Sequence, residues 1–344
     1  MTPSLNNQAV IATAGSRKTE FVIDHALAHP SERVLITTYT NENLAQISRR
    51  IHVKAGCIPP NITIMSWLSF VLNQCARPYQ VSILGKAGLI RSLNFHGSRN
   101  RFTPRTNPNS FYLDRDFDIY RDGLADFACQ VDGQSNGLVI TRLATIYDRI
   151  LVDEVQDLVG YDLDLLDLLF KSTIKMVVVG DPRQHTYGTN NSPKNKRYRG
   201  SGLVKWFEER ATTCHLEERH DNFRCNQAIC DFADALYPDM DATTSQNSET
   251  TGHDGIFKIT PSEVDAYVKQ YNPVILRDSR RTNVLGHKAI NIGVAKGSTY
   301  DRVLIFPTEP MKTYLKNRNP SAMTSVTRLY IAVTRARFSA TFVV

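Results

Sequence analysis

Residues 149–157 read RILVDEVQD, an apolar run followed directly by a cluster of acidic residues. Ile150–Val152 predicts a buried strand, and Asp153 and Glu154 would stand at its C-terminal end. In α/β proteins that hydrolyse nucleoside triphosphates, acids at this place hold a magnesium ion and orient the attacking water. The segment therefore predicts a parallel sheet with a phosphate-binding edge. An acidic helix N-terminus would explain the same residues in isolation.

A loop near the N-terminus supplies a candidate phosphate site. A strand at Val10–Ala12 leads into small residues and then into a helix that starts at Lys18. Small residues let backbone N–H groups wrap phosphates, a Lys reaches the outer phosphates, and a Thr coordinates magnesium. The pattern G-x-x-x-x-G-K-[ST] is not met, because Ala12 and Arg17 replace both glycines. The predicted nucleotide-binding residues of this loop are Ala14, Gly15, Ser16, Arg17, Lys18 and Thr19.

The acids and a downstream Gln complete the predicted chemistry. We expect Thr19 and Asp153 to hold the metal, and Glu154 to act as the general base on water. Residues 180–184 read GDPRQ after the strand Val177–Val179. Gln184 could sense the γ-phosphate there, although a polar turn after a strand is the simpler explanation of that segment alone. The Lys-Thr pair, the Asp-Glu pair and the GDPRQ segment, in this order, indicate a motor ATPase more strongly than any one of them alone.

Length, net charge and apolar content limit the kinds of binding partner that we expect. The chain has 344 residues and a formal net charge of +7, which is compatible with a polyanionic partner. Cations concentrate in Ser192–Arg199 and, as Arg99, Arg101 and Arg105, in another loop-like stretch. No apolar run approaches the ~18 residues of a membrane span, and no secretory signal is recognisable. We expect a cytoplasmic protein with no membrane partner.

Six cysteines, Cys57, Cys75, Cys129, Cys214, Cys225 and Cys230, form no C-x-x-C pair. We predict free thiols. The group of Cys214, His215, His220, Cys225 and Cys230 has a spacing that matches no common zinc finger.

Strand and helix patterns alternate along the chain, which predicts an α/β fold with parallel sheets flanked by helices. We expect an N-terminal domain over residues 1–215 and a C-terminal domain over 216–344. Between residues 78 and 147 the pattern loosens, which indicates an insertion or small subdomain.

Seven segments, taken together, resemble the motifs of superfamily 1 helicases of the UvrD/Rep/PcrA type. They occur in the family's order and span nearly the whole chain: TYTN (38–41), TIMSW (63–67), DEVQD (153–157), GDPRQHTYG (180–188), NFR (222–224), AKGSTYD (295–301) and RLYIAVTRA (328–336). The resemblance implies two tandem RecA-like P-loop domains with ATP and Mg²⁺ in the cleft between them.

The resemblance also implies residue roles. Arg224 and Arg335 would act as arginine fingers beside Lys18, Glu154 and Gln184 in catalysis. Phe223 would stack on the adenine, and Gly297 would border the nucleotide. Single-stranded DNA would contact Thr38, Thr40, Asn41, Ser66, Trp67 and Tyr187. Domain closure and opening would drive stepping, with 3′ to 5′ polarity.

The resemblance implies an ATP-dependent DNA helicase or single-strand DNA translocase. Only about 70 residues separate Arg224 from Lys296, too few for the large second-domain insertion of the family. A protein partner would then supply unwinding or targeting. Two alternatives stay open: an RNA helicase, suggested by residues 297–300, and a non-hydrolysing nucleic-acid-binding scaffold, suggested by Arg17.

Overall fold

The structure is a computed structural model that describes residues 6–85, 89–100, 102–186, 188–323 and 325–344. The chain divides into two compact units. The first contains the residues up to Ile11, Lys18–Pro182 and Tyr187–Glu217. The second contains Ala12–Arg17, Arg183–Thr186 and Glu218–Val344. Two short segments of the predicted N-terminal domain thus belong to the second unit.

The first unit is built on a sheet of strand order β3-β2-β6-β7-β1-β8. The pairs β2–β3, β2–β6, β6–β7 and β1–β7 are parallel. Registers such as Thr38 with Ser66 and Ile11 with Gly180 place the motif-bearing strand ends at one edge of the sheet. The strands are β1 (Gln8–Ala12), β2 (Val34–Thr38), β3 (Ile62–Ser66), β6 (Arg149–Val152), β7 (Lys175–Gly180) and β8 (His215–Arg219).

Helices pack against this sheet, and side-chain N-caps mark the start of two of them, α2 and α3. The Thr40 side chain accepts the Asn43 backbone N–H at the start of α2, and Gly56 closes that helix with a φ of 77°. Only a glycine adopts this left-handed conformation without strain. The helices are α1 (Lys18–Leu27), α2 (Asn41–Ala55), α3 (Trp67–Phe70), continued by a π-helical segment Val71–Ala76, α8 (Tyr161–Phe170) and α9 (Gly202–Glu208).

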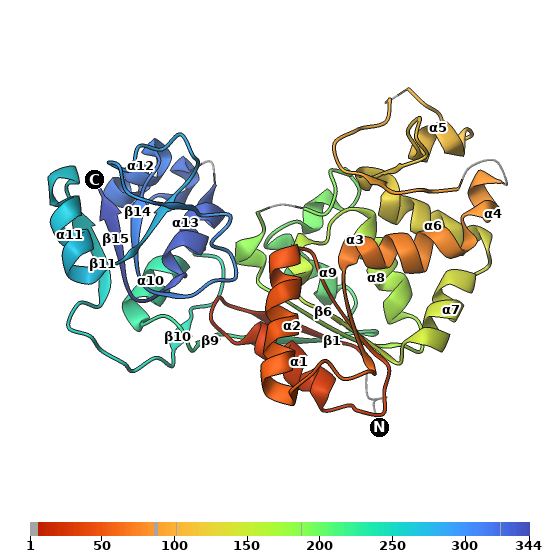
Figure 1. The fold of residues 1–344 in the computed structure, drawn as a ribbon, viewed down its shortest axis with the longest axis horizontal. Coiled ribbons are helices and arrows are strands. Elements are labelled where there is room, and N and C mark those ends of the chain that lie inside the picture. The colour runs from red at the N-terminus through yellow and green to blue at the C-terminus, as the bar shows by residue number, and fades with distance from the viewer. Residues whose placement is uncertain (1–5, 86–88, 101, 187, 324) are drawn as a thin grey trace. The chain divides into compact units, whose positions relative to one another are not determined.

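The insertion is better ordered than its composition suggests. Figure 1 shows α4, α6 and α7, in orange to yellow-green, close to α3 and α8, with α5 above them. Phe127 and Val131 of α6 and Val139 and Leu143 of α7 are fully buried in the same apolar core as Trp67. The insertion is therefore part of the first unit. Its elements are α4 (Val81–Leu84), β4 (Leu93–Asn94), α5 (Pro108–Tyr112), β5 (Ile119–Tyr120), α6 (Leu124–Gln134) and α7 (Leu138–Ile146).

The second unit contains a five-stranded sheet of order β11-β15-β14-β12-β13, and every pair in it is parallel. Along β14, Val303 and Ile305 belong to one apolar cluster and Leu304 and Phe306 to another. This alternation shows that both faces are covered. The strands are β11 (Gly255–Ile259), β12 (Val274–Arg277), β13 (Ile290–Asn291), β14 (Tyr300–Phe306) and β15 (Ala336–Val343).

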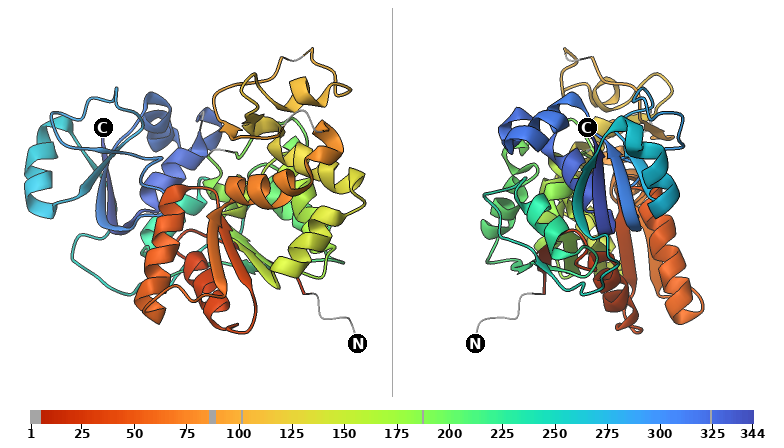
Figure 2. Two further views of the ribbon diagram at one scale, coloured as in Figure 1. Left: turned by 45° about the vertical axis from the view of Figure 1, so that its right-hand side comes forward. Right: turned by 90° about the vertical axis from the view of Figure 1, so that its left-hand side faces the viewer.

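Helices lie on both sides of this second sheet, as Figure 2 shows in its right-hand view. Val264 and Tyr267 of α11 pack in the cluster with Leu304. The other helices contribute to the cluster with Val303. The helices are α10 (Gln227–Asp234), α11 (Val264–Tyr271), α12 (Glu309–Asn317) and α13 (Val326–Val333), and a short pair of strands, β9 (Asp221–Asn222) and β10 (Thr244–Ser245), adjoins them.

The predicted α/β fold with parallel sheets flanked by helices is confirmed. Outside the insertion, the described strands and α-helices that were not predicted from sequence are β8, β9, β10, β11, β13, α9, α11 and α12. In the described residues, no helix is both long and apolar enough to cross a membrane.

Candidate functional site

The first unit brings its predicted metal and phosphate residues together at the end of β6. The Thr19 hydroxyl, on the first turn of α1, donates to the Asp153 carboxylate at 2.9 Å. Burial and, to a smaller extent, the adjacent Glu154 charge raise the pKa of Asp153 to about 6. The Thr19 bond and the Lys18 charge act in the opposite direction. A buried acid beside a second acid is a site that favours a bound cation.

Glu154 is held in an uncommon backbone conformation. Its φ is 59°, in the left-handed region, and its carboxylate accepts a bond from the Gln156 side-chain amide. The same amide group, through its oxygen, accepts the Asp181 backbone N–H at 3.0 Å. Non-glycine residues in this region often mark functional sites. Gln156 therefore connects the acid cluster to the GDPRQ segment.

This connection requires a glycine. A Cβ added at Gly180 would lie 2.4 Å from the Gln156 side-chain oxygen and 2.8 Å from Val155. Sequence reasoning did not single out Gln156, which is 1% exposed. The Gln of the DEVQD motif is the signal that could have identified it.

The predicted phosphate loop, Ala12–Arg17, belongs to the second unit. The Gly15 carbonyl accepts the Phe223 backbone N–H at 3.0 Å. A Cβ at Gly15, whose φ is 80°, would lie 2.3 Å from the Asn222 side-chain oxygen. The Ala14 backbone N–H donates to the Tyr330 hydroxyl at 3.2 Å. Gly15 is thus required both by its conformation and by the close approach of its neighbour.

Arg17 replaces a motif glycine yet keeps a glycine-like backbone. Its φ is 62°, a conformation that costs an L-residue roughly 1–2 kcal/mol. Its guanidinium carbon lies 4.1 Å from the centre of the Phe223 ring. Phe223 is 41% exposed. The side chain therefore covers one face of the ring that was predicted to stack on adenine.

The predicted arginines of the second unit are both held by backbone carbonyls. Arg224 donates to the Thr334 carbonyl at 2.9 Å. Arg335 donates to the Gln184 side-chain oxygen at 3.1 Å and to the Ser298 carbonyl at 3.3 Å. Arg335 is only 2% exposed. Gly297, the residue before Ser298, has a φ of 87° that suits glycine.

The predicted nucleic-acid contacts differ in exposure. Asn41, at the start of α2, is exposed, whereas Thr40 and Ser66 are half-buried caps of α2 and α3. Thr38 and Trp67 are fully buried.

The Trp67 indole donates to the Asp162 carboxylate at 2.7 Å. Thr38 and Trp67 were predicted to contact single-stranded nucleic acid. Because both side chains are buried, the structure does not support a direct contact. Tyr187 lies outside the described residues.

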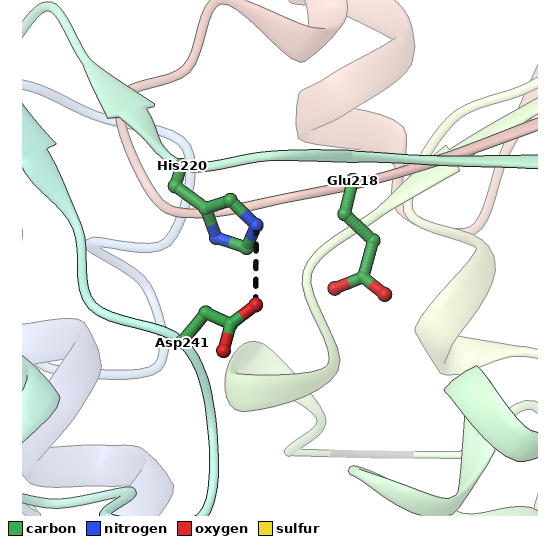
Figure 3. Close-up of side chains that lie close together, drawn as sticks. All are labelled: Glu218, His220 and Asp241. Carbon is green, nitrogen blue, oxygen red and sulfur yellow. Dashed lines mark ion pairs between the residues drawn. The ribbon is translucent and has the colours of Figure 1, made fainter.

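All six cysteines are free thiols. Among the described residues, one group of three side chains could together hold a metal ion, and it includes no cysteine. Figure 3 shows His220 facing Asp241, with 3.6 Å between the Nε2 and carboxylate oxygen, and Glu218 nearby. Glu218 and Asp241 are exposed. The predicted metal ligands Thr19 and Asp153 belong to the other unit.

Comparison with known proteins defines the class. The sequence profile described as viral superfamily 1 RNA helicase core domain matches residues 111–344. The chain belongs to this family. The prediction of a superfamily 1 helicase is confirmed, and the match assigns the chain to the viral type rather than to the UvrD/Rep/PcrA type. No curated protein sequence matches the chain.

Solved structures with a similar fold include an arterivirus helicase. The arterivirus nonstructural protein 10 helicase has a TM-score of 0.50 and 15% identity over 99% of this chain and 60% of its own. The same helicase solved with DNA has a TM-score of 0.50 and 15% identity, over 99% of this chain and 61% of its own. The PRRSV helicase has a TM-score of 0.48 and 16% identity over 98% and 52%. The chain spans between half and two thirds of the length of these proteins.

Proposed function

We propose that this chain is the motor core of a helicase or translocase that hydrolyses ATP to move along single-stranded RNA. The observation that carries the proposal is the Thr19–Asp153 hydrogen bond, with Lys18 and Glu154 beside it at the end of β6. Family membership supports the same chemistry.

The residues of the first unit fit a hard cation. A hydroxyl and a buried carboxylate are oxygen ligands of the kind Mg²⁺ takes, together with phosphate oxygens. When bound, Mg²⁺ would neutralise charge on the phosphates. Lys18 would contact the outer phosphates, and Asp153 and Thr19 would orient the metal. Glu154, positioned by Gln156, would accept the proton of the attacking water.

The residues of the second unit would respond to nucleotide. Arg224 and Arg335 would stabilise charge on the γ-phosphate, and Phe223 would stack on the base. Gln184 already accepts a bond from Arg335, so a Gln that senses the phosphate would also reorient that arginine. The loop residues Ala14, Gly15, Ser16 and Arg17, with Gly297, stay proposed nucleotide contacts, and Arg17 would make its contact through its backbone N–H.

RNA replaces DNA as the proposed substrate. The UvrD-type resemblance implied DNA and 3′ to 5′ polarity, and the assignment to a viral RNA helicase family removes that basis. DNA remains the second candidate, because one structural neighbour was solved as a complex with DNA. Thr40, Asn41, Ser66 and Tyr187 stay proposed contacts, and a protein partner that supplies targeting or unwinding stays proposed as well.

Steady-state ATP hydrolysis with single-stranded RNA, single-stranded DNA and neither tests the proposal. We expect RNA to stimulate hydrolysis most, and stimulation to fall steeply between about 50 and 200 mM salt. Lys18→Ala and Glu154→Gln should reduce the rate by at least about 100-fold. Equal rates with and without strands would contradict a motor. Nucleotide binding without turnover in the native chain would instead favour the non-hydrolysing scaffold.

A further inference from the structure

A basic and aromatic cavity lies in the first unit, and its lining includes none of the predicted motif residues. Its volume is about 550 Å³, within the range of roughly 300–1,000 Å³ that holds small ligands. The insertion forms one wall, the start of α8 another, and the segment after the GDPRQHTYG motif a third. The lining residues that matter here are Arg99, Arg105, Phe111, Asp126, Tyr161 and Lys194.

Hydrogen bonds fix the three walls to one another. Asn191 donates to the Asp122 carboxylate through its backbone and its side chain, each at 3.1 Å. The Asn195 side chain donates to the Gly160 carbonyl at 2.9 Å, next to the start of α8. The beginning of the basic segment Ser192–Arg199 is thus anchored against both other walls. These hydrogen bonds hold the walls of the cavity together.

Its acidic groups are already compensated. Arg105 pairs with Asp126 at 2.8 Å, and Asp126 is buried. Arg121 pairs with Asp122 at 3.0 Å. The other cations of the lining are Arg99 and Lys194, and Lys194 also pairs with Asp164 at the rim.

Those two cations lie over aromatic rings. The Arg99 guanidinium is 3.8 Å from the centre of the Phe111 ring. The Lys194 ammonium is 5.4 Å from the centre of the Tyr161 ring and 3.6 Å from the Asp164 carboxylate. Cations beside stacking surfaces are what single-stranded nucleic acid requires, because phosphates need charge and unpaired bases need a flat partner.

We propose that this cavity binds one unpaired nucleotide of the single strand, and this rests on the proposed motor function. Arg99 and Lys194 contact its phosphates, and Tyr161 stacks on its base. Arg105 holds Tyr161 in place, since it donates to the Tyr161 hydroxyl at 3.1 Å. The insertion thereby becomes part of the nucleic-acid interface.

Fluorescence anisotropy of a labelled oligouridylate strand, measured on the full chain without nucleotide, tests the proposal. The variant Arg99→Ala/Lys194→Ala should bind more weakly. The slope of its log affinity against log salt should fall by about 1.4, since each lost contact to a single strand contributes about 0.7. Tyr161→Leu should weaken binding at least about fivefold with an unchanged salt slope.

A matched control removes the same charge elsewhere. Arg33→Ala/Lys171→Ala removes two exposed cations that pair with Asp148 and Asp167. Lys171 follows the other end of α8 from Tyr161, roughly 15 Å away along the helix. The slope of log affinity against log salt for this control should differ from that of the native chain by less than about 0.7, half the change expected for the cavity variant.

ATP hydrolysis stimulated by single-stranded RNA distinguishes failure of the cavity proposal from failure of the proposed motor function. If the native chain is stimulated by RNA but the cavity variants keep native affinity and slope, the cavity proposal is wrong and the motor function stands. If the native chain neither binds nor responds to RNA, both proposals are wrong. Binding of labelled polyglutamate that depends on these residues, with RNA binding unaffected, would identify a protein-docking site and also overturn the proposal.

Discussion

Replacing Arg17 probes the relation between the unusual loop and the nucleotide base. The Arg17 guanidinium carbon lies 4.1 Å from the centre of the Phe223 ring and covers one of its faces. If that face binds the base, the arginine competes with the nucleotide. Arg17→Ala removes the competing contact and leaves the ring in place. Arg17→Gly also restores the residue that the φ of 62° favours.

The magnitude follows from the contact and from its exposure. A guanidinium over a ring at an exposed site contributes about 0.5–1 kcal/mol, and Phe223 is 41% exposed. A base must overcome this contact before it stacks, so Arg17→Ala should strengthen nucleotide binding about two- to fivefold. Arg17→Gly should be about 1 kcal/mol more stable than Arg17→Ala, because glycine adopts the left-handed backbone without strain.

Titration of a fluorescent ATP analogue with Mg²⁺, without nucleic acid, measures the effect. Phe223→Leu is the control background, in which Arg17→Ala should give no gain because there is no ring to uncover. A loss of affinity in Arg17→Ala would refute the reasoning, since it would mean that the guanidinium itself contacts the nucleotide. An equal gain in both backgrounds would refute it as well.

Three other substitutions have defined outcomes. Asp153→Asn removes a carboxylate whose pKa is raised from 3.8 to about 6. Ionisation of this carboxylate destabilises the native state as pH rises from 4 to 6. In thermal unfolding without metal, the variant should therefore be up to about 3 kcal/mol more stable than the native chain at pH 7.5, and equally stable at pH 4. Trp67→Phe loses a 2.7 Å bond to a buried carboxylate and should cost about 2 kcal/mol in urea unfolding, whereas oligonucleotide affinity should change less than about twofold. Gly180→Ala places a Cβ 2.4 Å from the Gln156 oxygen. It should lower the free energy of unfolding in urea by about 1–3 kcal/mol and reduce ATP hydrolysis. The control Gly133→Ala, which has open space around it in α6, should leave the free energy of unfolding unchanged or raise it.

The parallel sheet and the motif order could be predicted because they depend on local patterns. Ile150–Val152 is apolar and is followed by acids, which fixes both a buried strand and what stands at its end. The buried state of Trp67 could not be predicted in this way. Its partner, Asp162, is 95 residues away in sequence, and nothing in the TIMSW segment distinguishes a buried indole from one that faces a strand.

The insertion shows a different limit. Its Gly, Asn and Pro content suggested irregular structure, yet Phe127, Val131, Val139 and Leu143 recur at helical spacing and are fully buried. The apolar period was present in the sequence but was outweighed by composition. The cavity could not be predicted at all, because its walls come from three segments joined by Asn191 and Asn195.

Two buried carboxylates in the first unit show why geometry must accompany a shifted pKa. Burial raises the pKa of Asp162 to about 6, as it does that of Asp153. Asp162 accepts bonds from the side chains of Trp67, Thr189 and Asn190, so its acceptors are satisfied within the fold. Asp153 instead has a second acid as its neighbour, and within the described part of the chain Thr19 is the side chain that donates to it. A perturbed pKa alone does not separate a structural acid from a functional one. The arrangement of donors does, because an acid already saturated by the protein has little to offer a metal.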